Sequence, residues 1–305
     1  MLALFSMIVP MINAGARIPV ILDTDIGGDI DDTWALAMML KSPELDVRLV
    51  VTDTGNTTYR AKVAAKMLEV ANRTDVPVGI GLHLSDDEGP QSPWVEGYDL
   101  FSYPGTIYKD GVGALIDTIM NSPEPITLIC IGPVPNISAA LEREPGIAKK
   151  TRFVGMHGSV RKGYDGSEKV SAEYNVVAYP KECQKVFTAP WKDMTITPLD
   201  TCGLVNLKGE KYKKVADSDN PIAKAVIENY NIWSKRAPDR SSVLFDTAAI
   251  YLSFSQELLV MERLGISVTD DGYTVIDNNA QLINCAMEWK NLSAFEDLLM
   301  DRLTK

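Results

Sequence analysis

Five aspartates stand within ten residues near the start of the chain, in the segment V20-I-L-D-T-D-I-G-G-D-I-D-D32. Such closely spaced negative charges repel one another unless a cation neutralises them. The segment contains neither histidine nor cysteine, so its side-chain ligands are oxygens, which favours calcium or magnesium. Because a cage of several carboxylates and backbone carbonyls suits calcium, we expect a calcium site here.

The aspartates lie between two apolar segments. Residues 19–22 predict a buried strand that ends at Asp23, and residues 33–40 predict a helix that begins beside Asp31 and Asp32. The free N–H groups and the positive dipole end of that helix favour ionised carboxylates. A solvated Asp-rich turn is the alternative interpretation, and it does not account for the strand before the segment or the apolar helix after it.

Along the rest of the chain, strand-like segments alternate with helical ones. This alternation predicts an α/β fold with an open, mostly parallel, Rossmann-like sheet and helices on both faces. Ligands bind beyond the carboxyl ends of strands in such sheets, where this chain has its polar segments. We expect Asn136 to cap a helix running to about Glu144, and residues 83–110 to form a long loop. The expected strands are residues 19–22, 47–52, 76–80, 126–131, 151–155, 194–197, 273–276 and 282–287.

Six motifs in the same order resemble the inosine-uridine-type nucleoside hydrolases, a family of calcium-dependent N-ribohydrolases. The first, D23-T-D-I-G-G-D-I-D-D-T-W-A-L36, is similar to the family's N-terminal signature, although Ile26 replaces a proline and the spacer is longer. The others are V50-V-T-D-T-G-N56, I126-T-L-I-C-I-G-P-V-P-N-I-S-A-A-L141, F153-V-G-M-H-G158, A172-E-Y-N175 and L244-F-D-T247. The resemblance implies hydrolysis of the N-glycosidic bond of ribonucleosides to ribose and free base.

The resemblance also implies a role for individual residues. Cleavage of an N-glycosidic bond develops positive charge on the sugar, which nearby carboxylates stabilise, and calcium lowers the pKa of a water molecule. Asp25 would take the proton from that water. The implied calcium ligands are Asp25, Asp32, Asp246 and the backbone carbonyl of Ile131. The residues implied to orient the water or bind the ribose are Asp31, Asn56, Met156, Glu173 and Asn175.

One departure from the family concerns the leaving base. Many members have a histidine immediately before the late aspartate as an acid for the base, and this chain has Phe245 there. Some purine-cleaving relatives stack the base on aromatic rings, and a purine can be protonated at N7 from solvent, so we predict a purine preference. A donor from His157, Asp239 or Arg240 is an alternative. The base-pocket candidates are His157, Trp94, Tyr98, Tyr230, Trp233 and Phe245, each aromatic ring having core packing as its competing interpretation.

Two other functions fit part of the sequence. Haloacid-dehalogenase-type magnesium phosphatases also open with a strand and an Asp-x-Asp pair, in which Asp23 would be the nucleophile, but they leave the later motifs unexplained. A non-catalytic riboside-binding protein of the nucleoside hydrolase fold is the second alternative, because Phe245 replaces the acid. Release of phosphate, or ribose binding without release of base, would distinguish these functions from nucleoside hydrolysis.

Composition limits the partners. The formal net charge is −11 and no basic cluster is present, which argues against binding to nucleic acid or to an anionic membrane. The expected partner is a small-molecule nucleoside, and the resemblance implies a homodimer or homotetramer. The four cysteines form no C-x-x-C pair, which argues against a zinc site.

The first sixteen residues, MLALFSMIVPMINAGA, are apolar and end in small residues. They are similar to the apolar part of a signal peptide but lack its basic start, so they narrowly favour a secreted or periplasmic protein over a cytoplasmic one. An apolar extension packed on the domain is the alternative. We expect residues 17–305 to form a single nucleoside hydrolase-like domain.

Overall fold

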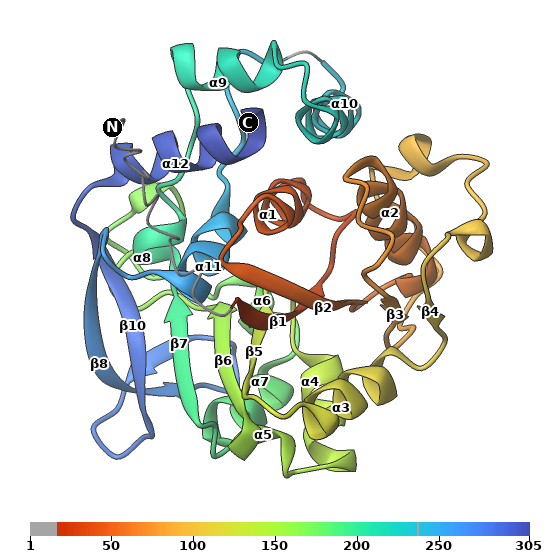
Figure 1. Ribbon diagram of the computed structural model, residues 1–305. Helices are drawn as coiled ribbons and strands as arrows, with labels where there is room; N and C mark the ends of the chain where they lie inside the picture. Colours follow the sequence, from red (N-terminus) through yellow and green to blue (C-terminus); the bar gives the residue numbers. More distant parts are fainter. Residues whose placement is uncertain (1–16, 237) are drawn as a thin grey trace, which may run out of the picture.

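Ten strands form one sheet in the computed structural model, which describes residues 17–236 and 238–305 (Figure 1). Their order is β4-β3-β2-β1-β5-β6-β7-β10-β8-β9. Neighbours from β4 to β10 pair in parallel, whereas β8 pairs antiparallel with both β10 and β9. The strands are β1 (Ile18–Thr24), β2 (Leu45–Thr52), β3 (Val78–Ile80), β4 (Ile107–Tyr108), β5 (Ile126–Cys130), β6 (Thr151–Met156), β7 (Asp193–Thr197), β8 (Leu259–Val268), β9 (Thr274–Ile276) and β10 (Leu282–Trp289).

Helices cover both faces of the sheet, as Figure 1 shows, and bury a separate apolar core under each face. One face carries α1 (Asp31–Leu40), α2 (Thr57–Val70), α8 (Leu199–Cys202), α9 (Gly209–Ala216), α10 (Pro221–Ser234), α11 (Phe245–Phe254) and α12 (Leu292–Thr304). The other carries α3 (Gly111–Asn121), α4 (Pro135–Arg143), α5 (Ile147–Lys150), α6 (Tyr174–Val177) and α7 (Pro180–Thr188). Three short 3-10 turns are η1 (Ser92–Val95), η2 (Leu100–Ser102) and η3 (Tyr164–Gly166).

Strand β1 explains how the aspartates reach the sheet edge. Successive side chains of a strand point to opposite faces, so Val20 and Leu22 enter one core and Ile21 enters the other. The chain leaves the sheet after Thr24 and begins α1 at Asp31. Because β1, β5 and β6 are adjacent and parallel, the segments that follow them converge at one edge.

The predicted α/β fold, with a mostly parallel sheet and helices on both faces, is confirmed. Strands β4 and β8 were not predicted: β4 lies within the predicted loop of residues 83–110, and the sequence of β8, LVMERLGISV, has adjacent charges and no regular alternation. In the described part of the chain, no helix is both long enough and apolar enough to cross a membrane. Residues 1–16, for which export was considered, lie outside the described residues.

The prediction that Asn136 caps a helix is wrong. Helix α4 begins one residue earlier, at Pro135. The Asn136 amide nitrogen donates to Asp23 Oδ2 at 2.9 Å and to the Thr52 carbonyl at 3.1 Å, and its Oδ1 accepts from Leu82 N at 2.9 Å. Asn136 therefore ties the ends of β1 and β2 to the segment that follows β3.

Candidate active site at the strand ends

A cavity of about 260 Å³ opens beyond the carboxyl ends of β1, β5 and β6. It brings together the Asp-rich segment, the end of β5, the loop after β6 and the start of α11. Its lining is Asp25, Gly28, Asp29, Asp31, Asp32, Arg60, Ile131, Met156, Tyr164, Glu173, Tyr174, Asn175, Phe245 and Asp246. Five of the six motifs noted in the sequence contribute to this lining, two of them only through Ile131 and Met156. Arg60 and Tyr164 lie outside the motifs.

Three buried carboxylates form the most compact group in this cavity. Asp31 and Asp32 lie in the first turn of α1 and Asp246 lies in the first turn of α11. Carboxylate oxygens of these three residues all lie within 4.8 Å of one another. Burial, followed by the charges of neighbouring aspartates, raises the pKa of all three carboxyls well above its usual range. An all-oxygen group of this kind is suited to a hard divalent cation, whose charge would offset both effects.

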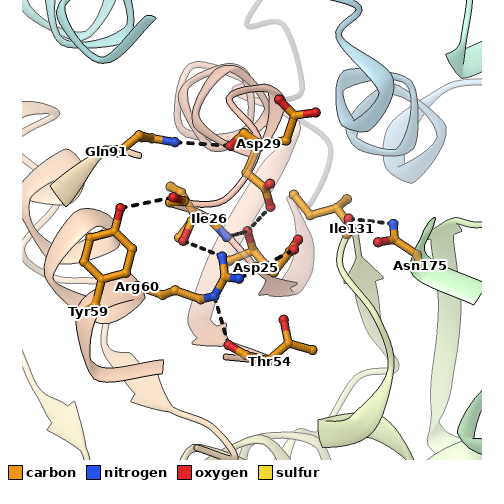
Figure 2. A network of polar contacts seen from close by, with 12 residues as sticks. Asp25, Ile26, Asp29, Thr54, Tyr59, Arg60, Gln91, Ile131 and Asn175 are labelled. Carbon is orange, nitrogen blue, oxygen red and sulfur yellow. Dashed lines mark hydrogen bonds and ion pairs between the residues drawn. The ribbon is translucent and has the colours of Figure 1, made fainter. Parts of the chain in front are cut away.

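Asp25 lies in the same cavity, beside the guanidinium of Arg60 (Figure 2). Arg60 Nη2 is 3.8 Å from Asp25 Oδ2, while its Nε and Nη1 donate to the carbonyls of Thr54 and Ile26 at 2.9 and 3.1 Å. Burial raises the pKa of Asp25 and the charge of Arg60 opposes that rise. Arg60, which the sequence analysis did not identify, thus joins the segments after β1 and β2 and faces the carboxylates.

Ile131, Glu173 and Asn175 form the opposite wall. The Asn175 side-chain nitrogen donates to the carbonyls of Ile131 and Met156, each at 3.0 Å, and Figure 2 shows the first of these bonds. The Glu173 carboxylate accepts from the backbone N–H groups of Gly158 at 2.9 Å and Asn175 at 2.8 Å. Burial nevertheless raises the pKa of Glu173 to about 7.

Aromatic side chains also line the cavity. The rings of Tyr164 and Phe245 meet edge to face, with centroids 6.0 Å apart. The Tyr164 hydroxyl accepts a hydrogen bond of 3.0 Å from the backbone N–H of Tyr174, which also lines the cavity. The sequence analysis did not select Tyr164, although the turn G163-Y-D-G166 in a long polar loop after a strand was a usable signal.

Two predicted site residues lie outside the cavity. Asn56 is the N-cap of α2: its Oδ1 accepts from Tyr59 N at 3.0 Å and its amide nitrogen donates to the Asp86 carbonyl at 3.1 Å. His157 is fully buried between the rings of Phe153 and Phe187, at centroid distances of 5.9 and 6.2 Å. Burial lowers the pKa of His157 to about 4, so the ring is neutral. In contrast to their predicted roles, neither Asn56 nor His157 lines the cavity.

The aromatic candidates other than Phe245 also lie outside the cavity. The Trp94 indole N–H donates to Glu228 at 3.2 Å, and the Tyr98 hydroxyl donates to Glu69 at 3.1 Å. Tyr230 stacks on Trp233 with a centroid distance of 5.9 Å. Trp94 and Tyr230 are buried in the apolar core, and Tyr98 and Trp233 pack against it, as the competing interpretation of core packing expects.

Asp23 does not line the cavity either. It is fully buried, accepts a hydrogen bond of 2.9 Å from Asn136 and contacts the Cys130 thiol. Burial raises its pKa to about 6. A phosphatase nucleophile must reach its substrate, so this position argues against the phosphatase alternative.

Comparison with known proteins identifies the family. The model of the inosine-uridine preferring nucleoside hydrolase family matches residues 20–303. The non-specific ribonucleoside hydrolase RihC of Klebsiella pneumoniae is 34% identical over 87% of this chain and 90% of its own length. A probable uridine nucleosidase 2 of Arabidopsis thaliana is 28% identical over 95% of this chain and 98% of its own length.

Solved structures agree on the fold. A plant nucleoside hydrolase superposes with a TM-score of 0.82 and 23% identity, covering 95% of this chain and 99% of that structure. A purine-preferring ribonucleoside hydrolase from Gardnerella vaginalis has a TM-score of 0.75 and 20% identity, covering 94% of this chain and 98% of its own. The resemblance read from the six motifs is thereby confirmed. The chain belongs to the inosine-uridine preferring nucleoside hydrolase family, and its enzyme class is that of an N-glycosyl hydrolase of ribonucleosides.

Proposed function

We propose that this protein hydrolyses ribonucleosides to ribose and free base with the help of a calcium ion, with Asp25 as the general base and with a preference for purines. The observation that carries the proposal is the grouping of buried carboxylates in a cavity of a nucleoside hydrolase fold. A cavity of about 260 Å³ has room for a sugar with part of a base.

The proposed calcium ligands are carboxylate oxygens of Asp25, Asp32 and Asp246 and the carbonyl of Ile131, all from residues that line the cavity. Asp32 and Asp246 belong to the compact group described above, and Asp31 is its third member. The donor set is entirely oxygen, as calcium requires. When bound, the ion would offset the carboxylate charge and lower the pKa of a water molecule.

Asp25 is the proposed proton acceptor because it lies in the cavity as a carboxylate paired with a cation. Arg60, 3.8 Å from Asp25 Oδ2, favours the ionised form that can accept a proton. As the C1′–N bond breaks, positive charge develops on the ribose. The neighbouring carboxylates of Asp31 and Asp32 would stabilise that charge, while Asp25 takes a proton from the attacking water.

Asp31, Glu173 and Asn175 are the proposed ligands of the ribose hydroxyls, with Met156 against the sugar. Glu173 and Asn175 are held by backbone and carbonyl hydrogen bonds, so their geometry is set before substrate arrives. Buried polar groups that a substrate leaves unpaired cost binding free energy, and this penalty would select for ribose over deoxyribose.

The proposed purine preference rests on the aromatic wall of Tyr164, Tyr174 and Phe245. A purine offers a larger face than uracil for contact with these rings, and its N7 can take a proton from solvent. The relatives carry different names, among them a uridine nucleosidase, a non-specific hydrolase and a purine-preferring hydrolase. The names of the relatives therefore favour no one base, whereas the aromatic wall of this cavity favours a purine.

Release of the free base from inosine, 2′-deoxyinosine and uridine tests the proposal. We expect inosine to be cleaved best, with kcat/KM at least about 100-fold lower for 2′-deoxyinosine. Asp25→Asn should lower kcat for inosine by at least about 100-fold, and Asp87→Asn, at an exposed position, serves as the matched control. Tight binding of inosine without ribose release would instead support the riboside-binding alternative.

A further inference from the structure

The cavity has few groups that can donate a hydrogen bond to a departing base. Phe245 has none, and Glu173, whose pKa is about 7, has both carboxyl oxygens hydrogen-bonded to backbone N–H groups. The other cavity residues with a side-chain N–H or phenolic O–H are Arg60, Asn175, Tyr164 and Tyr174. Arg60 is committed to two carbonyls and Asp25, and the Asn175 amide nitrogen is committed to two carbonyls. The two tyrosines remain.

Tyr164 has the better placed hydroxyl. Its ring lies edge to face with Phe245, the residue where relatives carry the acid, at a centroid distance of 6.0 Å. The hydroxyl accepts from Tyr174 N at 3.0 Å, which fixes its oxygen. Within residues 17–236 and 238–305 its own proton has no acceptor, so this O–H is free to donate to a ligand. In the part of the chain that the structure describes, the Tyr174 hydroxyl has no such anchor, and Tyr174 is 57% exposed compared with 38% for Tyr164.

The turn that carries Tyr164 is held in an unusual shape. A Cβ on Gly163 would lie 2.2 Å from the Lys169 carbonyl, so only glycine fits there. Gly163 N donates to the Ser167 carbonyl at 2.8 Å, which closes the turn. Asp165, a non-glycine residue, has a φ of +56°. Such backbone strain persists only where surrounding contacts fix it, and it is concentrated at functional sites.

The buried carboxylate of Asp200 holds residues 160–162, which precede this turn. The two oxygens of Asp200 accept hydrogen bonds from the backbone N–H groups of Val160, Arg161 and Lys162 at 2.9, 2.8 and 3.2 Å. Asp200 is 2% exposed. Tyr164 is thus presented by a segment fixed at both ends, which is the preorganisation that a catalytic hydrogen bond needs.

We propose that the Tyr164 hydroxyl donates a hydrogen bond to the departing base and so supplies the donor that Phe245 lacks. This inference rests on the proposed function. The C1′–N bond breaks and its electron pair moves onto the base, where the Tyr164 O–H stabilises the negative charge. Burial raises the pKa of Tyr164 to about 12, so the phenol keeps its proton. The base takes its final proton from solvent, and the proton of the attacking water goes to Asp25.

The test compares two ribosides in the full-length protein with calcium. A hydrogen-bond donor stabilises the departing base of inosine, whereas the nitrophenolate of p-nitrophenyl β-D-ribofuranoside leaves readily without such a donor. Tyr164→Phe keeps the ring against Phe245 and removes only the hydroxyl. We expect kcat for inosine to fall about 100-fold, with kcat for the nitrophenyl riboside within about 3-fold. Tyr108→Phe, at an exposed tyrosine outside the cavity, is the matched control and should change neither rate.

Each other outcome has a defined meaning. An equal fall for both ribosides assigns Tyr164 a merely structural role and overturns the inference. An unchanged rate for inosine overturns it as well, while leaving the proposed hydrolase function intact. Failure of the unmodified protein to release ribose from either substrate overturns the proposed function itself, and the inference with it.

Discussion

Replacement of His157 by leucine should make the free energy of unfolding less sensitive to acid pH and leave the rate of hydrolysis unchanged. The His157 ring is fully buried among aromatic side chains and does not line the cavity. Burial lowers its pKa from 6.5 to about 4, against a smaller opposing effect of the Gly132 backbone. The folded protein therefore keeps this ring neutral at pH values where the unfolded chain protonates it.

The expected magnitude follows from these two values. One pKa unit corresponds to about 1.4 kcal/mol, so full protonation of the unfolded chain at His157 lowers the free energy of unfolding by about 3 kcal/mol. The contribution of His157 is fully present above pH 6.5 and is lost as the pH falls from 6.5 toward about 4. At pH 5 about 2 kcal/mol of it should be gone.

Urea unfolding at pH 7.5 and pH 5 measures the effect. Between these pH values the unmodified protein should lose about 2 kcal/mol more unfolding free energy than His157→Leu. His83→Leu, which removes a histidine with an exposed side chain, should behave like the unmodified protein. Equal pH dependence in all three proteins would refute the buried neutral histidine. A folded His157→Leu variant with inosine hydrolysis reduced more than about 10-fold would show instead that His157 takes part in the reaction.

Three further substitutions test other contacts. Asn56→Ala should lower the free energy of unfolding by about 1 kcal/mol through loss of the α2 cap, measured by urea unfolding, with kcat for inosine within about 2-fold. Arg60→Gln should lower kcat about 10-fold with KM nearly constant, because Asp25 loses its neighbouring cation; steady-state kinetics with a rise in KM alone would contradict this. Asp200→Asn should destabilise the fold by about 2 kcal/mol by weakening three bonds to residues 160–162, and a raised KM for inosine should accompany it.

The fold and the carboxylate group can be predicted from the sequence because both depend on local signals. Apolar runs alternating with helical segments define a parallel sheet, and its strand ends must meet at one edge. The aspartates lie at and after the end of β1, and Asp246 lies in the first turn of a helix within a recognisable motif. Asp25, Asp31, Asp32 and Asp246, which these features predict to lie together, all line one cavity.

The aromatic wall of the cavity could not be predicted from the sequence in the same way. Trp94 and Tyr230 have the residue types of a base pocket, but only the packing of α2 and α10 reveals that they are buried between helices. Tyr164 depends on a strained turn and on a buried carboxylate distant in the chain. Asn56 follows a strand as a ligand would, yet its side chain is used by the adjoining helix. Each of these outcomes is decided by tertiary contacts, which have no local signature.

Chelation and restoration of calcium test the central claim most directly. The full-length protein is treated with a chelator, freed of it, and assayed for ribose release from inosine before and after addition of calcium. We expect activity to fall by at least about 100-fold after chelation and to return on addition of calcium, and we expect Asp246→Asn to need a higher calcium concentration for the same recovery. Undiminished ribose release from protein shown to contain no calcium would contradict the claim.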